Sequence, residues 1–354
     1  MPSLKDIAQM VGVSISTVSR VINNDTSKHI SADTKNRVWE AVKALNYQPN
    51  ETPRRLLQKK LSQAEPDTQP RRIGCILSLP NNKYNHPYFS PILAGIEDKL
   101  KSLGCVLHFI RTEDEIREDL TNHQFEGEGK PDGLIFVESV EKSLYQQLRE
   151  VVPYCVGIDI ADPTVPVIAY DRVIAAKAAT QHLIEQGHER IGFIGGVGLT
   201  GDMTREKRFR GYREALERAA LTLNPDWVMN SEWDVDRSYE CMKRLLHEHP
   251  NDLPTAMFCA SDMMAISAMR AVTESGLRIP EDIAFIGLDN IDFAKYTSPA
   301  LSSIHIPKYE MGLAAAKSLL DWMEGAYLVP YRMVLPFELM IRESSIHSQI
   351  LIER

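Results

Sequence analysis

The apolar positions of the chain follow a helical spacing near the N-terminus and change to strand-like runs after residue 72. Between Leu4 and Val11 apolar residues recur every three or four positions, which is typical of one face of an α-helix. Gly12 can end that helix in a left-handed conformation, and Ser14 can cap a second helix over 15–23. The pattern therefore predicts a helix, a tight turn and a second helix.

A third amphipathic helix is predicted within 31–47, capped by Ser31. Three short helices with such a turn indicate a helix-turn-helix DNA reader, whose second helix enters the major groove. A plain helical bundle is the alternative. DNA binding is favoured because the second helix carries short hydrogen-bonding side chains outward while Val18 and Val21 point inward. These outward residues are Ser14, Ser16, Thr17, Ser19, Arg20 and Asn23.

After Arg72, apolar strand-like segments alternate with amphipathic helices. The predicted strands are 72–79, 105–110, 133–137 and 155–160, then 190–196, 256–261, 283–289 and 301–306. The predicted helices are 91–103, 117–123, 144–151, 174–186, 206–220, 237–249, 263–275 and 308–324. This alternation predicts parallel sheets with helices on both faces, in two α/β subdomains. A ligand cleft is expected at the carboxyl ends of the strands, with a crossover between 157–160 and 167–171.

Composition narrows the class of protein. With 354 residues, of which 44% are hydrophobic and 25% charged, the chain is a globular protein of two or three domains. No apolar run reaches the roughly 18 residues that span a membrane, and the N-terminus lacks a signal-peptide layout, so a cytoplasmic protein without a membrane partner is expected. The five scattered cysteines are interpreted as reduced core residues, and the histidines show no metal-ligand spacing.

The formal net charge of −8 is unevenly distributed. Residues 1–72 hold 12 Lys and Arg and 7 Asp and Glu, whereas the rest holds 28 and 41. A basic head on an acidic body indicates that only the head meets a polyanion.

One glycine-rich segment imitates a dinucleotide-binding loop. Gly196, Gly198 and Gly201 have the G-x-G-x-x-G spacing after a predicted strand. The acidic residue that should end a following strand is missing, since Glu217 falls in a predicted helix. We expect these glycines to let a loop turn at the cleft edge. Because the sequence also lacks a P-loop and a G-x-S-x-G elbow, neither an enzyme nor a cofactor is expected.

The segments "LKDIAQMVGVSISTVSRVIN" and "ISADTKNRVWEAVKALNYQPN" closely resemble the DNA-binding head of the LacI/GalR family of bacterial transcriptional repressors. The resemblance implies that Ile15 and Ser16 choose operator bases and that Arg20 makes a specific major-groove contact, most simply to guanine. It implies mainly phosphate contacts for Ser14, Thr17, Ser19 and Asn23.

The body resembles the sugar-binding core of the same family, through segments such as "GHERIGFIGG", "REKRFRGYREAL" and "FELMIRESS". This implies a periplasmic-binding-protein-like (type I) core of two Rossmann-like subdomains behind a small all-α head. The head is expected at 1–50, a hinge helix and linker at 51–71, and the effector-binding and dimerisation core at 72–354. The first subdomain is expected at about 72–160 and 290–325, and the second at about 161–289 and 326–345.

The resemblance also implies an effector site. Its implied sugar-hydroxyl ligands are Asp171, Arg208 and Asp289, and its implied aromatic walls are Tyr88, Phe89 and Trp233. Alternatively the two aspartates cap helices, Arg208 is a solvated helix residue and the aromatics belong to the core. Ser261 stands where many relatives carry Asn, and Ile306 and Lys308 also depart from the pattern, so the identity of the ligand stays open.

The segment "PNETPRRLLQKK" corresponds to the family's hinge helix. The resemblance implies that Leu56 enters the minor groove and that Arg54 and Arg55 follow phosphates. Thr52 is expected to cap a helix that starts at Pro53 and is too short to persist alone in water. A basic linker is the alternative.

These features predict a dimeric repressor of a carbohydrate-utilisation operon. Two heads of a homodimer would bind a near-palindromic operator, and a sugar or glycoside, galactose-type by resemblance, would change the hinge geometry. The sequence near its C-terminus has no heptad repeat, which favours a dimer over a tetramer. A sugar-transport component and an enzyme of doubly wound fold are the alternative classes.

Overall fold

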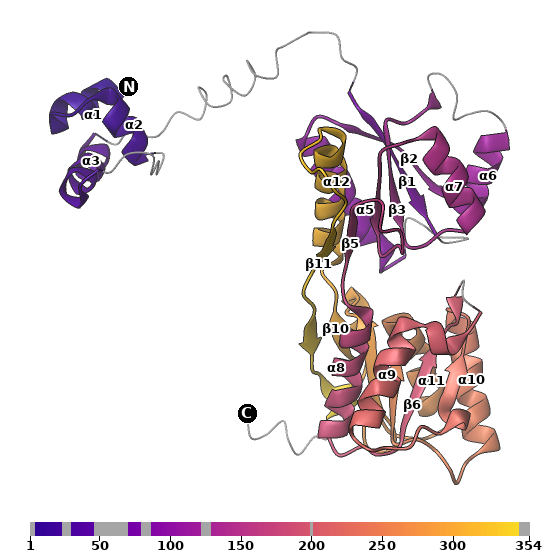
Figure 1. Ribbon diagram of the computed structural model, residues 1–354. Helices are drawn as coiled ribbons and strands as arrows, with labels where there is room; N and C mark the ends of the chain where they lie inside the picture. Colours follow the sequence, from indigo (N-terminus) through magenta and orange to yellow (C-terminus); the bar gives the residue numbers. More distant parts are fainter. Residues whose placement is uncertain are drawn as a thin grey trace. The chain divides into compact units, whose positions relative to one another are not determined.

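The computed structural model describes residues 4–22, 30–45, 70–78, 86–121, 129–198 and 201–346. The chain forms two compact units, the head (Met1–Gln69) and the core (Pro70–Arg354) (Figure 1). The predictions for Asn23 and for the hinge residues Arg54, Arg55 and Leu56 lie outside the described residues.

The head contains the three predicted helices: α1 (Leu4–Val11), α2 (Ile15–Ile22) and α3 (Ala32–Ala44). Ile7, Val18 and Val38, one from each helix, are completely buried against one another. Gly12 ends α1 in the predicted left-handed conformation, with φ of 72°. The helix-turn-helix prediction is therefore confirmed.

The first sheet of the core has six parallel strands in the order β11-β5-β4-β3-β1-β2. They are β1 (Arg72–Leu77), β2 (Val106–Thr112), β3 (Gly133–Val137), β4 (Cys155–Ile158), β5 (Val167–Ala169) and β11 (Arg332–Val334). Helices α5 (Phe89–Ser102) and α12 (Lys308–Met323) cover one face, and α6 (Glu113–Thr121) and α7 (Lys142–Val151) cover the other (Figure 1).

Two glycines allow α5 and α12 to lie in contact. A Cβ atom at Gly95 would stand 2.1 Å from the Tyr309 carbonyl oxygen, and one at Gly312 would stand 2.1 Å from the Ile92 carbonyl oxygen. Any larger residue would separate the helices, so α12 belongs to the first subdomain although it lies far from α5 in the sequence.

The second sheet also has six strands, in the order β12-β10-β9-β8-β6-β7, and only β12 runs antiparallel to its neighbour. Its strands are β6 (Ile191–Gly195), β7 (Val228–Asn230), β8 (Ala256–Cys259), β9 (Ala284–Asp289), β10 (Ser302–His305) and β12 (Glu338–Met340). Its helices are α8 (Arg172–Glu185), α9 (Lys207–Arg218), α10 (Val235–Glu248) and α11 (Asp262–Glu274). Short 3₁₀ turns are η3 (Met203–Arg205), η4 (Pro225–Trp227), η5 (Asp292–Tyr296) and η6 (Glu343–Ser345). The predicted two-subdomain α/β architecture is confirmed.

The chain crosses between the subdomains after β5, after β10 and after β11. This corrects the subdomain boundaries expected from the sequence. β5 still pairs with β4 in the first sheet, β10 pairs with β9 in the second, and β11 returns to pair with β5. The boundaries shift because strand pairing, and not the order of apolar runs, decides which sheet a segment joins.

Candidate functional site

The outer face of α2 presents the predicted base-reading residues. Ser14, Ile15 and Ser16 are exposed, with Ile15 47% accessible, while Thr17 and Arg20 are half-buried. The Ser14 hydroxyl accepts a hydrogen bond from the Thr17 amide at 3.1 Å, so it caps α2 as predicted. An exposed isoleucine beside a small hydroxyl can contact a thymine methyl group. Ser19 also lies within α2.

In the core, polar side chains gather where parallel strands end. Glu138 follows β3, Asp159 follows β4, Asp289 ends β9 and Trp233 lies just beyond β7. All four have positive φ angles, 67°, 56°, 117° and 63° respectively. Such conformations cost non-glycine residues about 1–3 kcal/mol each and concentrate at functional sites. The strand ends therefore hold a strained polar cluster.

A buried arginine organises one side of this cluster. The Arg172 guanidinium, at the start of α8, donates to the Glu138 carboxylate and lies 3.2 Å from an Asp159 oxygen. The Tyr88 hydroxyl donates to Glu138 at 3.2 Å. The buried Tyr170 hydroxyl has no hydrogen-bond partner within the described parts of the chain. A buried polar atom without a partner is a place where a ligand or water is expected.

The pKa values of the two carboxyls beside Arg172 are shifted in opposite directions. Burial raises the pKa of Asp159 to about 6, although Arg172 opposes the rise. Burial also acts to raise the pKa of Glu138, but the charge and hydrogen bond of Arg172 outweigh it and the pKa falls. Glu138 is therefore the firmly ionised partner.

The opposite side of the cluster contains Arg208 and Trp233. The Arg208 Nε atom donates to Glu206 at 3.0 Å, and its guanidinium lies 4.1 Å from the centre of the Trp233 ring. A Cβ atom at Gly196 would stand 2.5 Å from Trp233, so this glycine makes room for the tryptophan. Gly198 turns in the left-handed region, with φ of 57°. The glycine segment thus shapes the loop that packs against Trp233.

A second pair of buried carboxyls lies at the end of β9. Burial raises the pKa of Asp289 to about 8 and that of Asp262 to about 7. Asp262 accepts hydrogen bonds from the Ser303 hydroxyl at 2.6 Å and the Ile291 amide at 2.8 Å. The Lys308 amino group donates to the Asp289 carbonyl oxygen. Burial lowers the pKa of Lys308.

Three predicted effector residues make structural contacts within the core, which for Asp171 and Phe89 are the helix cap and the core packing named as alternatives. Asp171 caps α8, accepting from the Val173 and Ile174 amides at 3.0 Å each. Ser261 caps α11 through the Met264 amide at 3.3 Å. Phe89 is buried, with its ring edge-on to Tyr88 at 5.0 Å between centroids. Their role toward an effector stays a prediction.

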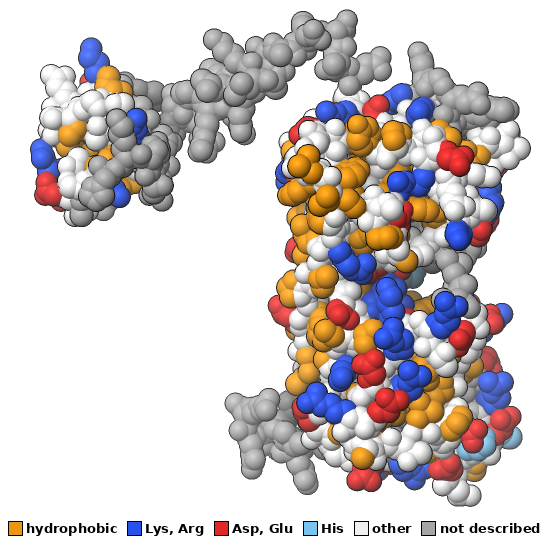
Figure 2. All heavy atoms as spheres, in the orientation of Figure 1, with side chains coloured by type: hydrophobic (Ala, Val, Ile, Leu, Met, Phe, Trp, Pro, Cys, Tyr) orange, Lys and Arg blue, Asp and Glu red, His pale blue; other side chains and the backbone are white. Residues whose placement is uncertain are grey.

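The structure also brings in residues that the sequence interpretation did not select: Glu138, Asp159, Tyr170 and Arg172. Glu138 and Asp159 carry a signal of their own, since each directly follows an apolar strand, whereas Asp289 was implied by the family resemblance. Arg172 has no such signal. On the face shown in Figure 2, Lys and Arg side chains gather where the two subdomains meet.

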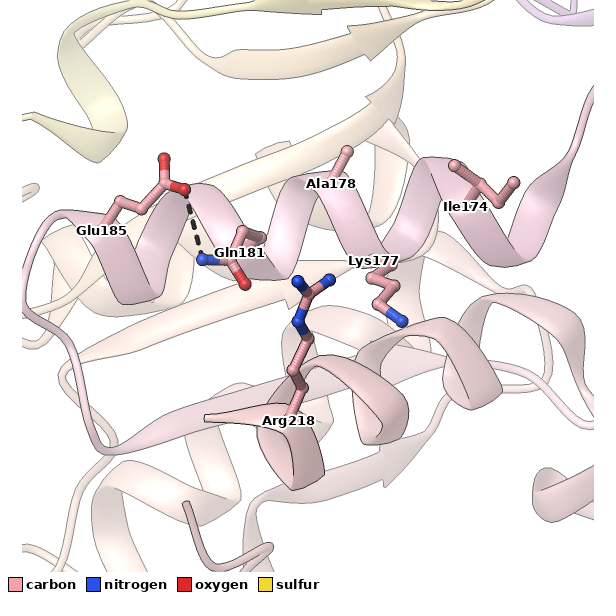
Figure 3. Close-up of a pocket in the computed structure, with 6 residues that line it drawn as sticks. All are labelled: Ile174, Lys177, Ala178, Gln181, Glu185 and Arg218. Atoms are coloured by element: carbon pink, nitrogen blue, oxygen red, sulfur yellow. Dashed lines mark hydrogen bonds between the residues drawn. The ribbon is translucent and has the colours of Figure 1, made fainter. Parts of the chain in front are cut away.

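A separate depression of about 410 Å³ lies on the surface of α8 and α9 (Figure 3). It is lined by Ile174, Lys177, Ala178, Gln181, Glu185 and Arg218. None of the predicted effector residues is among them. This depression is therefore distinct from the polar cluster at the strand ends.

Among the described residues, no helix combines the length and the apolar character needed to cross a membrane. Within the same residues, no group of His, Cys, Asp and Glu side chains is arranged to hold a metal ion.

Comparisons with known proteins agree with this architecture. Residues 3–50 match the family described as bacterial regulatory proteins, lacI family, and residues 180–345 match the periplasmic binding protein-like domain. The HTH-type transcriptional repressor PurR of Haemophilus influenzae (strain PittEE) is 34% identical over 352 residues, 97% of this chain and 98% of that protein.

Two solved structures extend the likeness. The transcriptional regulator CelR in complex with cellobiose is 30% identical, with a TM-score of 0.69 over 97% of this chain and 100% of that one. The lac repressor dimer bound to operator and the anti-inducer ONPF is 25% identical, with a TM-score of 0.65 over 98% of this chain and 99% of that one. Because the head, the core and the full-length relative all agree, the chain belongs to the LacI family of bacterial transcriptional regulators.

Proposed function

We propose that this protein represses a carbohydrate-utilisation operon and that a sugar or glycoside, bound at the strand ends of the core, controls its affinity for the operator. The observation that carries the proposal is the buried polar cluster beside Trp233, joined in one chain to a helix-turn-helix head. The protein acts by binding and needs no cofactor.

The head reads the operator through the exposed start of α2. Ile15 and Ser16 contact base edges, Arg20 supplies a major-groove hydrogen bond, and the neighbouring hydroxyls contact phosphates. A single head of this size has a small interface, so a homodimer with two heads on a near-palindromic operator supplies the affinity. The lac repressor, similar over almost the whole chain, is a dimer on its operator.

The effector binds where carboxylates, guanidinium groups and an aromatic face converge. Asp289 and Arg208 suit adjacent hydroxyl groups, and the Trp233 ring suits the apolar face of a pyranose. The cellobiose complex of CelR supports a sugar as the ligand class. A galactose-type ligand is the narrower form of this proposal.

Repression and its release then follow from differential affinity. If the effector binds one subdomain arrangement more tightly, it shifts the dimer between operator-competent and incompetent states. A coupling of about 1–3 kcal/mol would change operator affinity roughly 5-fold to 150-fold.

The test begins with selecting an operator from random double-stranded DNA by repeated binding to the full-length protein. Fluorescence anisotropy then measures the operator Kd with cellobiose, galactose, a β-galactoside and a purine base as separate probes. We expect one sugar to shift the Kd within the range given above, and Arg208→Ala to remove most of the shift. Arg210→Ala is the matched control, because Arg210 lies on the same helix with its side chain about half exposed.

Failure to enrich any DNA sequence at low salt would contradict the repressor role. A shift produced by the purine base and by no sugar would replace the carbohydrate effector with a nucleobase.

A further inference from the structure

Two helices of the core begin with a buried cation immediately after the chain has crossed between subdomains. Arg172 is the first residue of α8, which follows β5 of the first sheet. Lys308 is the first residue of α12, which follows β10 of the second sheet. Helix α8 packs on α9 in the second subdomain, and α12 packs on α5 in the first.

Each cation reaches back to the sheet that the chain has just left. Arg172 contacts Glu138 and Asp159, which follow β3 and β4 of the first sheet. Lys308 donates to the Asp289 carbonyl oxygen at the end of β9 in the second sheet. Two of the three crossovers are thus spanned by a contact from a cation in one subdomain to the strand ends of the other.

The Arg172 contact is largely shielded from water. The side chains of Arg172, Asp159 and Glu138 are 11%, 0% and 21% exposed. Ion pairs in such surroundings are weakly screened by salt, and removing one partner leaves an uncompensated buried charge. By contrast, an exposed ion pair would contribute little to holding two subdomains together.

The groups that face Arg172 connect it to the candidate effector site. The charge of Arg172 interacts with Tyr88 and Tyr170. The charge of Arg208 interacts with Tyr170 and with Glu138, so both arginines share these two neighbours. A ligand hydroxyl that donates to Glu138 or Asp159 would compete directly with the guanidinium for those oxygens.

We propose that Arg172 and Lys308 are paired positioning residues that fix the angle between the two subdomains, and that Arg172 couples the cleft to that angle. The second part rests on the proposed function, whereas the first part concerns the core alone. An effector that takes the carboxylate oxygens from Arg172 releases one of the two contacts. The subdomains then rotate about the crossovers, and this rotation transmits effector binding to the head.

Hydrogen exchange of the full-length protein, without DNA and without effector, tests the first part. We expect Arg172→Gln to speed exchange on the order of tenfold in peptides covering 166–174 and 304–311, while β3 and β8 keep their protection. Lys308→Gln should act on the same peptides, and Arg172→Lys should restore part of the protection. Arg210→Gln, which removes a cation of α9 outside these contacts, should change neither set.

A purely stabilising role predicts faster exchange throughout the core. That result, or crossover peptides that exchange as in the Arg210→Gln variant, would overturn the proposal. If Arg172→Gln does not fold, the combined Glu138→Gln, Asp159→Asn and Arg172→Gln variant keeps the side-chain volumes without the charges. The same pattern in that variant supports the proposal, and its absence refutes it.

Operator affinity tests the second part. On the selected operator, Arg172→Gln should change the effector-free Kd several-fold, and Arg210→Gln should leave it unchanged. An unchanged Kd in both variants would refute the coupling. Because the exchange experiment uses neither DNA nor sugar, it remains decisive even if no sugar alters operator binding.

Discussion

The head and the core place their functional groups in opposite surroundings. In the head, a small apolar cluster around Val18 supports residues such as Ile15 and Ser16 that remain exposed. In the core, Asp159, Asp262 and Asp289 are buried, and burial raises the pKa of each carboxyl. On the proposed function, a substitution on the head surface alters recognition with little effect on folding, whereas one in the buried polar cluster of the core changes effector binding and stability together.

The largest expected effect is a pH dependence of core stability that originates in the buried carboxyls. Burial raises the folded-state pKa of Asp262 to about 7 and of Asp289 to about 8, whereas both titrate near 4 when unfolded. The folded state therefore binds more protons between these values. Their contribution to stability is complete below about pH 4 and is lost as the pH rises toward 7 and 8, by at most about 1.4 kcal/mol per pH unit for each group.

Asp262→Asn should reduce the fall in unfolding free energy with rising pH, because an amide does not titrate. The measurement is urea unfolding of the core at several pH values between 4.5 and 8, as the difference between the parent and the variant. Burial lowers the pKa of His182, so this residue makes stability rise with pH, opposite to the carboxyls. Its contribution is the same in both proteins and cancels in the difference. Asp292→Asn, whose side chain is 98% exposed, is the control. Equal slopes in the parent and Asp262→Asn would contradict the prediction.

The secondary structure of the head could be predicted from the sequence more completely than that of the core. The head's helices were predictable because each carries its own apolar stripe and cap, and Ser14 and Gly12 stand where the pattern required them. In the core the long strands and helices were predictable for the same reason. Four strands of three residues each, β5, β7, β11 and β12, are too short to show an alternation.

The features that could not be predicted from the sequence depend on contacts between distant segments. The run containing β10 was predicted as a strand, but its pairing with β9 is not written in the local pattern. Glu138 and Asp159 could have been found from their positions directly after buried strands, since ligands bind at the carboxyl ends of parallel strands. Arg172 could not, because its significance depends on two carboxylates that lie 34 and 13 residues earlier.

A substitution that affects only operator recognition should have an effect of intermediate size. Arg20→Ala should relax discrimination at one operator position by about 1–3 kcal/mol, because a bidentate contact to one base is lost. Binding to the selected operator and to duplexes with single substitutions, measured by anisotropy at fixed salt, gives the position. Equal losses on operator and random DNA would assign Arg20 to the phosphates instead.

The smallest expected effect separates stability from recognition within the head itself. Ser14 and Ser31 each cap a helix, accepting from the Thr17 amide at 3.1 Å and from the Thr34 amide at 3.3 Å. Ser14→Ala and Ser31→Ala should therefore cost similar amounts of head stability, about 1 kcal/mol each.

Only Ser14 also lies at the start of the reading helix, where its hydroxyl is 2.8 Å from those of Ser16 and Thr17. We expect Ser14→Ala to lower operator affinity further than Ser31→Ala when both are compared at equal fractions of folded head. Thermal unfolding followed by circular dichroism gives that fraction, and anisotropy gives the Kd. If the two variants lose operator affinity equally, Ser14 acts only as a cap, and the exposed surface that reads DNA begins at Ile15.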